Sequence, residues 1–163
     1  MDISWIYNID PLLATFLVAL IPVLELRASI PIALANFDLT ITQIFTASVL
    51  GSFLPAIVIV YWLEPISNVL RKIKFFDRFF EWLFKRTRAK FDKKYALGSN
   101  VALMFFVGVP LPGTGAWTGA LIAWLFNFDK KQALVAIFLG CVIAALIVLL
   151  ASLGVIKIFD FIL

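Results

Sequence analysis

Two opposite charges, Glu25 and Arg27, lie in an otherwise uncharged stretch between Pro22 and Pro31. An ionisable group at membrane depth costs ~2.5–3.5 kcal/mol on insertion scales and by default marks a functional site. The Glu25 carboxyl group could carry a proton or a cation, and Arg27 could bind an anionic headgroup or neutralise Glu25. The alternative is a structural ion pair, which would need a break in the helix, because residues i and i+2 do not face each other on a continuous helix.

A second candidate site lies within the apolar segment from Val101 to Phe126. Gly113, Thr114 and Gly115 directly precede an expected half-helix over 116–126, and free amides at the start of a helix favour an anion. Alternatively, the glycines only permit a tight turn and close helix packing. The candidate binding residues of the two stretches are Glu25, Arg27, Pro31, Pro110, Pro112, Gly113, Thr114, Gly115, Trp117 and Thr118.

The composition places both stretches in an integral membrane protein. Of the 163 residues, 63% are hydrophobic, whereas soluble domains are about 45–50% apolar. The chain contains no histidine and one cysteine, so zinc and haem sites and a serine-hydrolase triad are not expected. We therefore expect neither a cofactor nor a metal, and no enzymatic activity. The first 26 residues contain no lysine or arginine, so a cleavable signal is not expected either.

The segments that carry the candidate sites are too short to cross a bilayer in one pass. Each half of 101–126 would extend ~14–17 Å as a helix, about half of a hydrocarbon core of ~30 Å. We predict a re-entrant hairpin there, and a similar pair of half-spans around Pro22–Pro31. Irregular backbone at that depth must be covered by protein or by a water-filled cavity, which favours a site for a polar ligand. In contrast, 41–63 and 133–156 are uninterrupted and long enough to span.

Residues 66–100 form a basic segment rich in aromatic residues. It contains ten of the fourteen lysine and arginine residues of the chain. This pattern predicts a basic amphipathic helix on the membrane surface. Nucleic-acid binding is the weaker interpretation beside so much apolar sequence, and we do not expect it.

The two broken segments are followed by similar sequences. The turn Asn36–Asp38 recurs as Asn127–Asp129, and the pair Leu50–Gly51 recurs as Leu139–Gly140. Each half therefore consists of a broken apolar segment, a turn and a full span. Corresponding interrupted segments in two halves of a chain indicate the binding site of a transporter.

The positions of the positive charges distinguish two topologies. If both broken segments are re-entrant, the basic segment and Lys130–Lys131 share the cytoplasmic side. If both segments cross fully, giving four spans, Lys130–Lys131 lies outside. The first arrangement agrees better with the positive-inside rule and relates the halves by inverted topology. We therefore predict a multi-pass plasma-membrane protein with both termini outside.

The predicted fold class is an all-α integral membrane protein. Two re-entrant helical hairpins and two transmembrane helices form an inverted repeat, with a basic amphipathic interfacial helix between the halves. The single membrane domain, 1–163, comprises a repeat half at 11–65, the cytoplasmic basic segment at 66–100 and a repeat half at 101–157. Two spans and two hairpins can barely enclose a pathway, so we expect a homo-oligomer, most simply a dimer.

The blocks ELRASIP at Glu25–Pro31 and PLPGTGAWTGA at Pro110–Ala120 resemble the small multidrug export protein family over most of the chain. That family is distantly similar to the DedA/VTT membrane proteins, whose paired re-entrant elements are associated with lipid-phosphate flipping or proton-coupled transport. Thr114 follows Gly113 here, where the DedA Pro-Gly-Glu motif has an acid. The resemblance implies a transporter for small molecules.

We expect a multidrug-type exporter of a small amphipathic solute, coupled to a proton or another cation through Glu25. The first alternative is a flippase or scramblase of phosphate-bearing lipids, such as polyprenyl phosphate, that uses Arg27 and the amides of 113–115. The second is a membrane scaffold without transport, whose basic segment recruits partners. The expected partners are thus the lipid bilayer, the solute or lipid phosphate, a proton or cation, and a second copy of the chain.

Overall fold

The computed structural model describes Ile6, residues 8–70, Arg78, Glu81, Trp82, Lys85, residues 100–111 and residues 113–162. Most of the basic segment expected at 66–100, and Pro112 of the second candidate site, lie outside the described residues. The described part contains helices and no strand, which confirms the all-helical class. The helices are α1 (Pro11–Leu20), α2 (Glu25–Asn36), α3 (Ile41–Leu70), α6 (Asn100–Gly108), α7 (Ala116–Leu125) and α8 (Lys130–Ile162).

Short polar side chains begin three of these helices. Asp10 caps α1 by accepting hydrogen bonds from two backbone amides of the first turn, at 2.9 and 3.0 Å. Thr40 and Gln43 form a capping box at the start of α3. The backbone amide of Thr40 donates to Oε1 of Gln43, and the backbone amide of Gln43 donates to the Thr40 hydroxyl. Asp129 accepts from the backbone amide of Gln132 at 2.9 Å, at the start of α8. These caps fix where the two long helices start after their turns.

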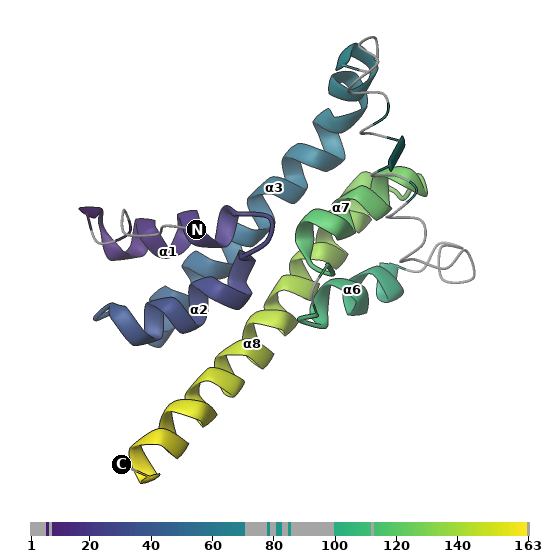
Figure 1. Cartoon of the computed structure of the whole chain (residues 1–163). Coiled ribbons are helices and arrows are strands. Elements are labelled where there is room, and N and C mark those ends of the chain that lie inside the picture. The colour runs from purple at the N-terminus through teal and green to yellow at the C-terminus, as the bar shows by residue number, and fades with distance from the viewer. Residues whose placement is uncertain are drawn as a thin grey trace.

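The four short helices form two hairpins. In each hairpin the second helix turns back alongside the first, as α2 does beside α1 and α7 beside α6 (Figure 1). The helices contain 10, 12, 9 and 10 residues, about half of the ~20 residues that a bilayer crossing requires. The linkers are 21–24 and 109–115. The second linker lies at the predicted break, whereas the first is shorter than the predicted 22–31, because α2 begins at Glu25 and continues through Pro31.

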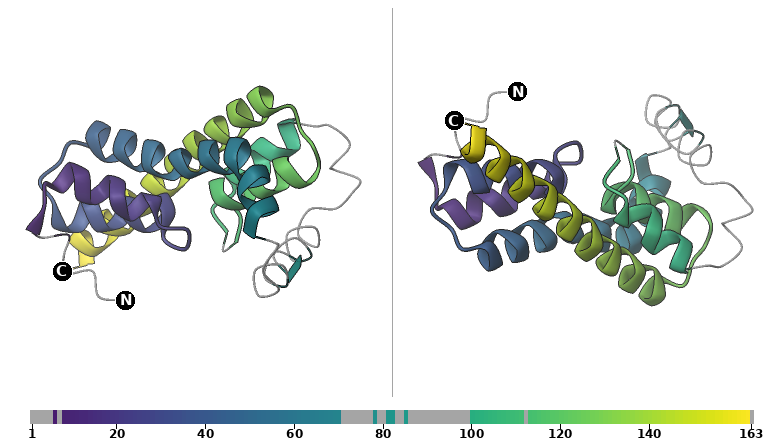
Figure 2. Two further views of the ribbon diagram at one scale, coloured as in Figure 1. Left: turned by 90° about the horizontal axis from the view of Figure 1, so that it is seen from above. Right: turned by 90° about the horizontal axis from the view of Figure 1, so that it is seen from below.

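The long helices α3 and α8 cross each other and carry one hairpin toward each end (Figure 2). Their stretches Ile41–Leu63 and Lys130–Gly154 are each long and apolar enough to cross a membrane. The sequence placed these spans at 41–63 and 133–156. Both helices are longer than these predicted spans: α3 ends at Leu70, and α8 runs from Lys130 to Ile162.

The interior of the fold is built largely from small side chains, which let the helices approach closely. Large apolar side chains on the long helices instead point outward: Val58 of α3 and Leu150 of α8 are 50% and 69% exposed. In water such surfaces would be unfavourable, whereas lipid tails solvate them. The outward apolar faces therefore agree with a bilayer around α3 and α8.

The main helix contacts of one half have counterparts in the other. α1 packs on α3 as α6 packs on α8, α2 and α7 each contact both long helices, and each hairpin is internally packed. The repeated Leu-Gly pair explains the closest of these contacts. A Cβ at Gly51 would clash with the carbonyl oxygen of Phe16 in α1, and a Cβ at Gly140 would lie 2.7 Å from the carbonyl oxygen of Met104 in α6. The two glycines thus serve the same packing in the two halves.

Candidate functional site

Glu25 is the first residue of α2, and its backbone is not helical in the usual sense. Its φ is +47°, in the left-handed region that non-glycine residues adopt at a cost. Its backbone amide donates to the carbonyl oxygen of Ile21 at 2.9 Å, which closes the linker turn. The residue is only 4% exposed. The positive φ therefore lies at the start of α2, directly after the 21–24 linker.

The Glu25 carboxylate lies at the N-terminus of α7. A Cβ at Gly115 would lie 2.8 Å from Oε1 of Glu25 and closer still to Oε2, and the backbone amide of Trp117 interacts with the carboxylate. The φ of Gly115 is +116°, a second reason why glycine stands there. The first amides of a helix lack partners and carry partial positive charge, so they stabilise a nearby anion. The anion at this helix terminus is a side chain of the protein itself.

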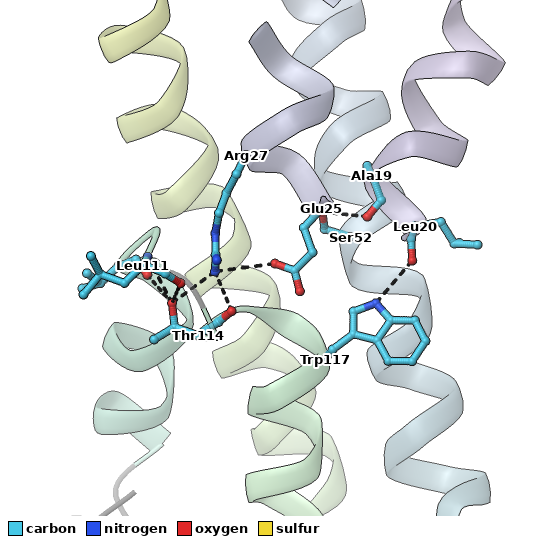
Figure 3. A network of polar contacts seen from close by, with 9 residues as sticks. Ala19, Leu20, Glu25, Arg27, Ser52, Leu111, Thr114 and Trp117 are labelled. Atoms are coloured by element: carbon cyan, nitrogen blue, oxygen red, sulfur yellow. Dashed lines mark hydrogen bonds and ion pairs between the residues drawn. The ribbon is translucent and has the colours of Figure 1, made fainter. Parts of the chain in front are cut away.

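Arg27 bridges the two hairpins (Figure 3). Its Nη2 donates to the backbone carbonyl oxygen of Thr114 and, at 3.1 Å, to the Thr114 hydroxyl. The same nitrogen lies 3.7 Å from Oε2 of Glu25, beyond hydrogen-bond distance. Arg27 is therefore held by Thr114 and faces Glu25 as a neighbouring charge. Buried charges are retained where they are paired and hydrogen-bonded. Here Arg27 is paired with Glu25 and hydrogen-bonded to Thr114.

Thr114 also organises the turn between α6 and α7. Its hydroxyl lies 2.6 Å from the carbonyl oxygen of Val109 and 2.7 Å from that of Leu111. The backbone amide of Leu111 donates to the same hydroxyl at 3.2 Å. A single hydroxyl thus ties together the turn and the guanidinium of Arg27.

Trp117 connects α7 to α1. Its indole Nε1 donates to the carbonyl oxygen of Leu20 at 3.3 Å, and Leu20 is the last residue of α1. Carbonyl oxygens at a helix C-terminus have no partner within the helix, so this bond satisfies one of them. The tryptophan lies between the two hairpin tips, where the sequence analysis placed a ligand-binding residue.

The structure brings together half of the predicted site residues. Glu25, Arg27, Thr114, Gly115 and Trp117 meet where the hairpin tips approach each other. Pro31 lies about 9 Å farther along α2 than Glu25, from the helical rise. The partly buried Pro110 and the exposed Gly113 lie in the turn before α7, and Thr118 is a partly buried residue of α7. The binding roles of all ten predicted residues stay predictions.

Five residues outside the predicted set line the same space as Glu25 and Arg27: Leu26, Val107, Ala116, Cys141 and Ala144. This space is too narrow to hold a water molecule. The internal sequence repeat contained a signal that could have identified Cys141. Cys141 follows Gly140 as Ser52 follows Gly51, and the Ser52 hydroxyl lies 3.3 Å from the carbonyl oxygen of Ala19 at the end of α1.

The chemistry of this site is that of charge binding. It offers a buried carboxylate, a guanidinium and the positive end of α7. Within the described residues, no three His, Cys, Asp or Glu side chains lie close enough to hold a metal ion. The space between these groups is closed, and the Glu25 carboxylate lies beside Gly115 at the N-terminus of α7.

Comparison with known proteins identifies the family. A sequence model of the family described as "Putative small multi-drug export protein" matches residues 25–147, from Glu25 at the start of α2 into α8. The chain belongs to this family. The match confirms the resemblance carried by the ELRASIP and PLPGTGAWTGA blocks, and the distant similarity to DedA/VTT proteins stays a prediction. No curated protein and no solved structure matches the chain. Family membership and the two long apolar helices together mark a membrane protein of a family named for export.

Proposed function

We propose that this protein is an exporter of small amphipathic solutes, not an enzyme, and that Glu25 is its coupling site. The observation that carries the proposal is the buried Glu25 carboxylate at the junction of the two hairpins. Glu25 is the one charged residue among the buried residues of the described chain. Such a group in a membrane protein is a functional candidate by default.

The contacts of Glu25 favour reversible binding of a proton or a cation. Arg27 is hydrogen-bonded to Thr114 and stands 3.7 Å from the carboxylate, so no short bond locks the pair. The carboxylate is attracted to Arg27 and to the N-terminus of α7 only while it is charged. Protonation removes both attractions at once and weakens the junction between the hairpins. Deprotonation restores them, so the charge state of one residue is coupled to opening and closing.

The proposed topology is that of two re-entrant hairpins entering from opposite faces of the plasma membrane. The shortness of the four hairpin helices supports it, because none reaches across a bilayer alone. The corresponding helix contacts of the two halves support an inverted repeat. In this arrangement 66–100 and Lys130–Lys131 are cytoplasmic and both termini are outside, which satisfies the positive-inside rule.

A pathway past Glu25 must open during transport, because the closed space cannot hold a water molecule. Rocking of one hairpin against the other around the Glu25 junction is the motion that the repeat favours. With two spans and two hairpins in each copy, we propose that two copies assemble to enclose the pathway.

The position of Glu25 favours a second candidate function. Since its carboxylate occupies the N-terminus of α7, an anionic headgroup of similar charge could displace it and pair with Arg27. The protein would then be a flippase or scramblase of phosphate-bearing lipids. The charge of the substrate separates the two functions: a cationic amphiphile for the exporter, and an anionic lipid phosphate for the flippase.

Transport by proteoliposomes tests these functions. Wild-type protein should move a fluorescent cationic amphiphile such as ethidium, at a rate that depends on an imposed pH gradient. Glu25→Gln should abolish that dependence, whereas Asp38→Asn, which neutralises an exposed carboxylate in a turn, should preserve it. If Glu25→Gln transports normally at every pH, the coupling role is wrong. If wild-type vesicles scramble a lipid phosphate and ignore ethidium, the flippase replaces the exporter.

A further inference from the structure

A groove runs along the outer side of α6 and α8, away from the Glu25 junction. It encloses about 370 Å³. Its apolar walls include Met104 of α6 and two exposed residues of α8, Val135 and Leu139. One end is polar, with the side chains of Asn100, Lys131 and Gln132. The groove thus has one charged end and an apolar body.

This division follows the expected depth in the bilayer. Lys131 lies at the start of the stretch Lys130–Gly154 of α8, which is long and apolar enough to cross a membrane. Leu139 is two helical turns farther along, ~12 Å deeper at 1.5 Å per residue. The charged end therefore lies at the membrane–water boundary and the apolar body extends into the hydrocarbon. A molecule that fits both ends is an amphiphile.

The polar end has unused capacity for binding. Lys131 is exposed and has no ion-pair partner within the described part of the chain. The Asn100 amide donates to Oε1 of Gln132 at 2.6 Å. Oδ1 of Asn100 is buried and finds no hydrogen-bond partner among the described residues. A headgroup that carries a negative charge for Lys131 and a hydroxyl donor for Asn100 would complement this end.

The other half of the chain has an equivalent groove with the opposite charge. It lies between α1 and α3, encloses about 320 Å³ and has Asp10 at its polar end. Thr46 and Leu50 line it at the positions that Val135 and Leu139 occupy in α8, in the register set by the two Leu-Gly pairs. Asp10 is already engaged as the cap of α1. The two grooves thus differ mainly in the charge at their mouths, so charge should decide what each one binds.

We propose that the α6–α8 groove binds an anionic phospholipid of the surrounding bilayer. The phosphate lies at Lys131, one acyl chain lies against Met104, Val135 and Leu139, and a headgroup hydroxyl faces Asn100. A positive side chain at the boundary attracts anionic lipid electrostatically, and the groove adds apolar contact along the chain. The site does not depend on the transport function of Glu25. It gives the protein a bound lipid on the side where Lys130–Lys131 lies.

Native mass spectrometry of the full-length protein in neutral detergent tests the site. The probes are phosphatidylglycerol, which is anionic and carries hydroxyls, and phosphatidylcholine with the same acyl chains. We expect severalfold tighter binding of phosphatidylglycerol, and loss of that preference in Lys131→Glu, because a single lysine close to the phosphate contributes a preference of that size for an anionic lipid. Lys131→Arg should keep it. Equal binding of the two lipids to the wild type would overturn the proposal.

Lys130→Glu is the matched control. It makes the same charge change one residue away, but Lys130 lines a different pocket and lies over the ring of Tyr61, at 5.6 Å from its centroid. We expect Lys130→Glu to keep the preference for phosphatidylglycerol. If it loses as much as Lys131→Glu, the effect is a general surface charge and there is no site.

Two variants test the apolar body of the groove. Leu139→Trp, at a 43% exposed position, fills the groove and leaves Lys131 in place, so it should reduce phosphatidylglycerol binding severalfold. Unchanged binding would mean that only the headgroup associates. Val135→Cys on a Cys141→Ala background should stay monomeric on SDS gels after oxidation in membranes. An efficient disulfide between copies would show that a second chain, not a lipid, covers the groove.

Discussion

The carboxylate of Glu25 and the α-carbon of Gly115 are in direct apposition across the two hairpins. Residue 115 could not carry a Cβ, because that atom would stand 2.8 Å from Oε1 of Glu25 and nearer to Oε2. Both residues have positive φ, +47° and +116°. The two unusual backbone conformations therefore occur at one contact, which holds a charge against the N-terminus of α7.

Gly115→Ala should destabilise the protein strongly. The alanine would have to adopt φ +116° and ψ −175°, a region almost restricted to glycine that costs ~1–3 kcal/mol, and its methyl group would displace the Glu25 carboxylate. Thermal unfolding in detergent should show a clear decrease in Tm. Gly154→Ala is the control, because a Cβ there meets nothing within 4 Å and alanine favours the helix by up to ~1 kcal/mol. An unchanged Tm for Gly115→Ala would contradict the close apposition.

The pair Gly51→Ala and Gly140→Ala should behave alike. Each adds a methyl group where α3 meets α1 or where α8 meets α6, against backbone carbonyl groups that cannot move as a flexible side chain could. Overpacking of this kind typically costs ~1–3 kcal/mol. Tm measurements should give similar decreases for both variants and little change for Gly154→Ala. A large effect in one half only would argue against equivalent roles in the repeat.

The sequence allowed prediction of the two breaks, the short helices around them, the long helices and the Glu25–Arg27 pair. These features depend on local composition: prolines, runs of apolar residues, and two opposite charges two residues apart, for which an ion pair was one of the two alternatives. The position of the Glu25 carboxylate at the N-terminus of α7 was not predictable from the sequence. Glu25 and Gly115 are far apart in the chain, and no local pattern sets the distance between them. For the same reason the contacts of the Thr114 hydroxyl and carbonyl groups with Arg27 were not predictable. The expected role of Thr114 in ligand binding stays a prediction.

Arg27→Met should destabilise the protein more than the double variant Glu25→Gln/Arg27→Met. The single change removes the neighbouring positive charge and leaves a buried carboxylate uncompensated, for which ~3–5 kcal/mol is typical. The double change removes both charges, so part of the stability should return while coupled transport stays lost. A double-mutant cycle of unfolding free energies, with Glu25→Gln as the other single variant, measures this coupling. Additive effects would mean that the 3.7 Å pair contributes no interaction energy.

Chemical labelling from each side of the membrane should place the two turns on opposite sides. On a Cys141→Ala background, Asp38→Cys and Lys130→Cys place single cysteines at two exposed positions, in the turn before α3 and at the first residue of α8. If the hairpins are re-entrant, α3 is the only full span between residues 38 and 130, so the two residues lie on opposite sides of the membrane. Residue 38 should then react from outside and residue 130 from the cytoplasm. If α1 and α2 instead form one full crossing and α6 and α7 another, both should react from outside, because two spans, α3 and the α6–α7 crossing, then separate them. That outcome would leave Lys130–Lys131 against the positive-inside rule. It would also remove the inverted repeat on which the proposed rocking around Glu25 depends.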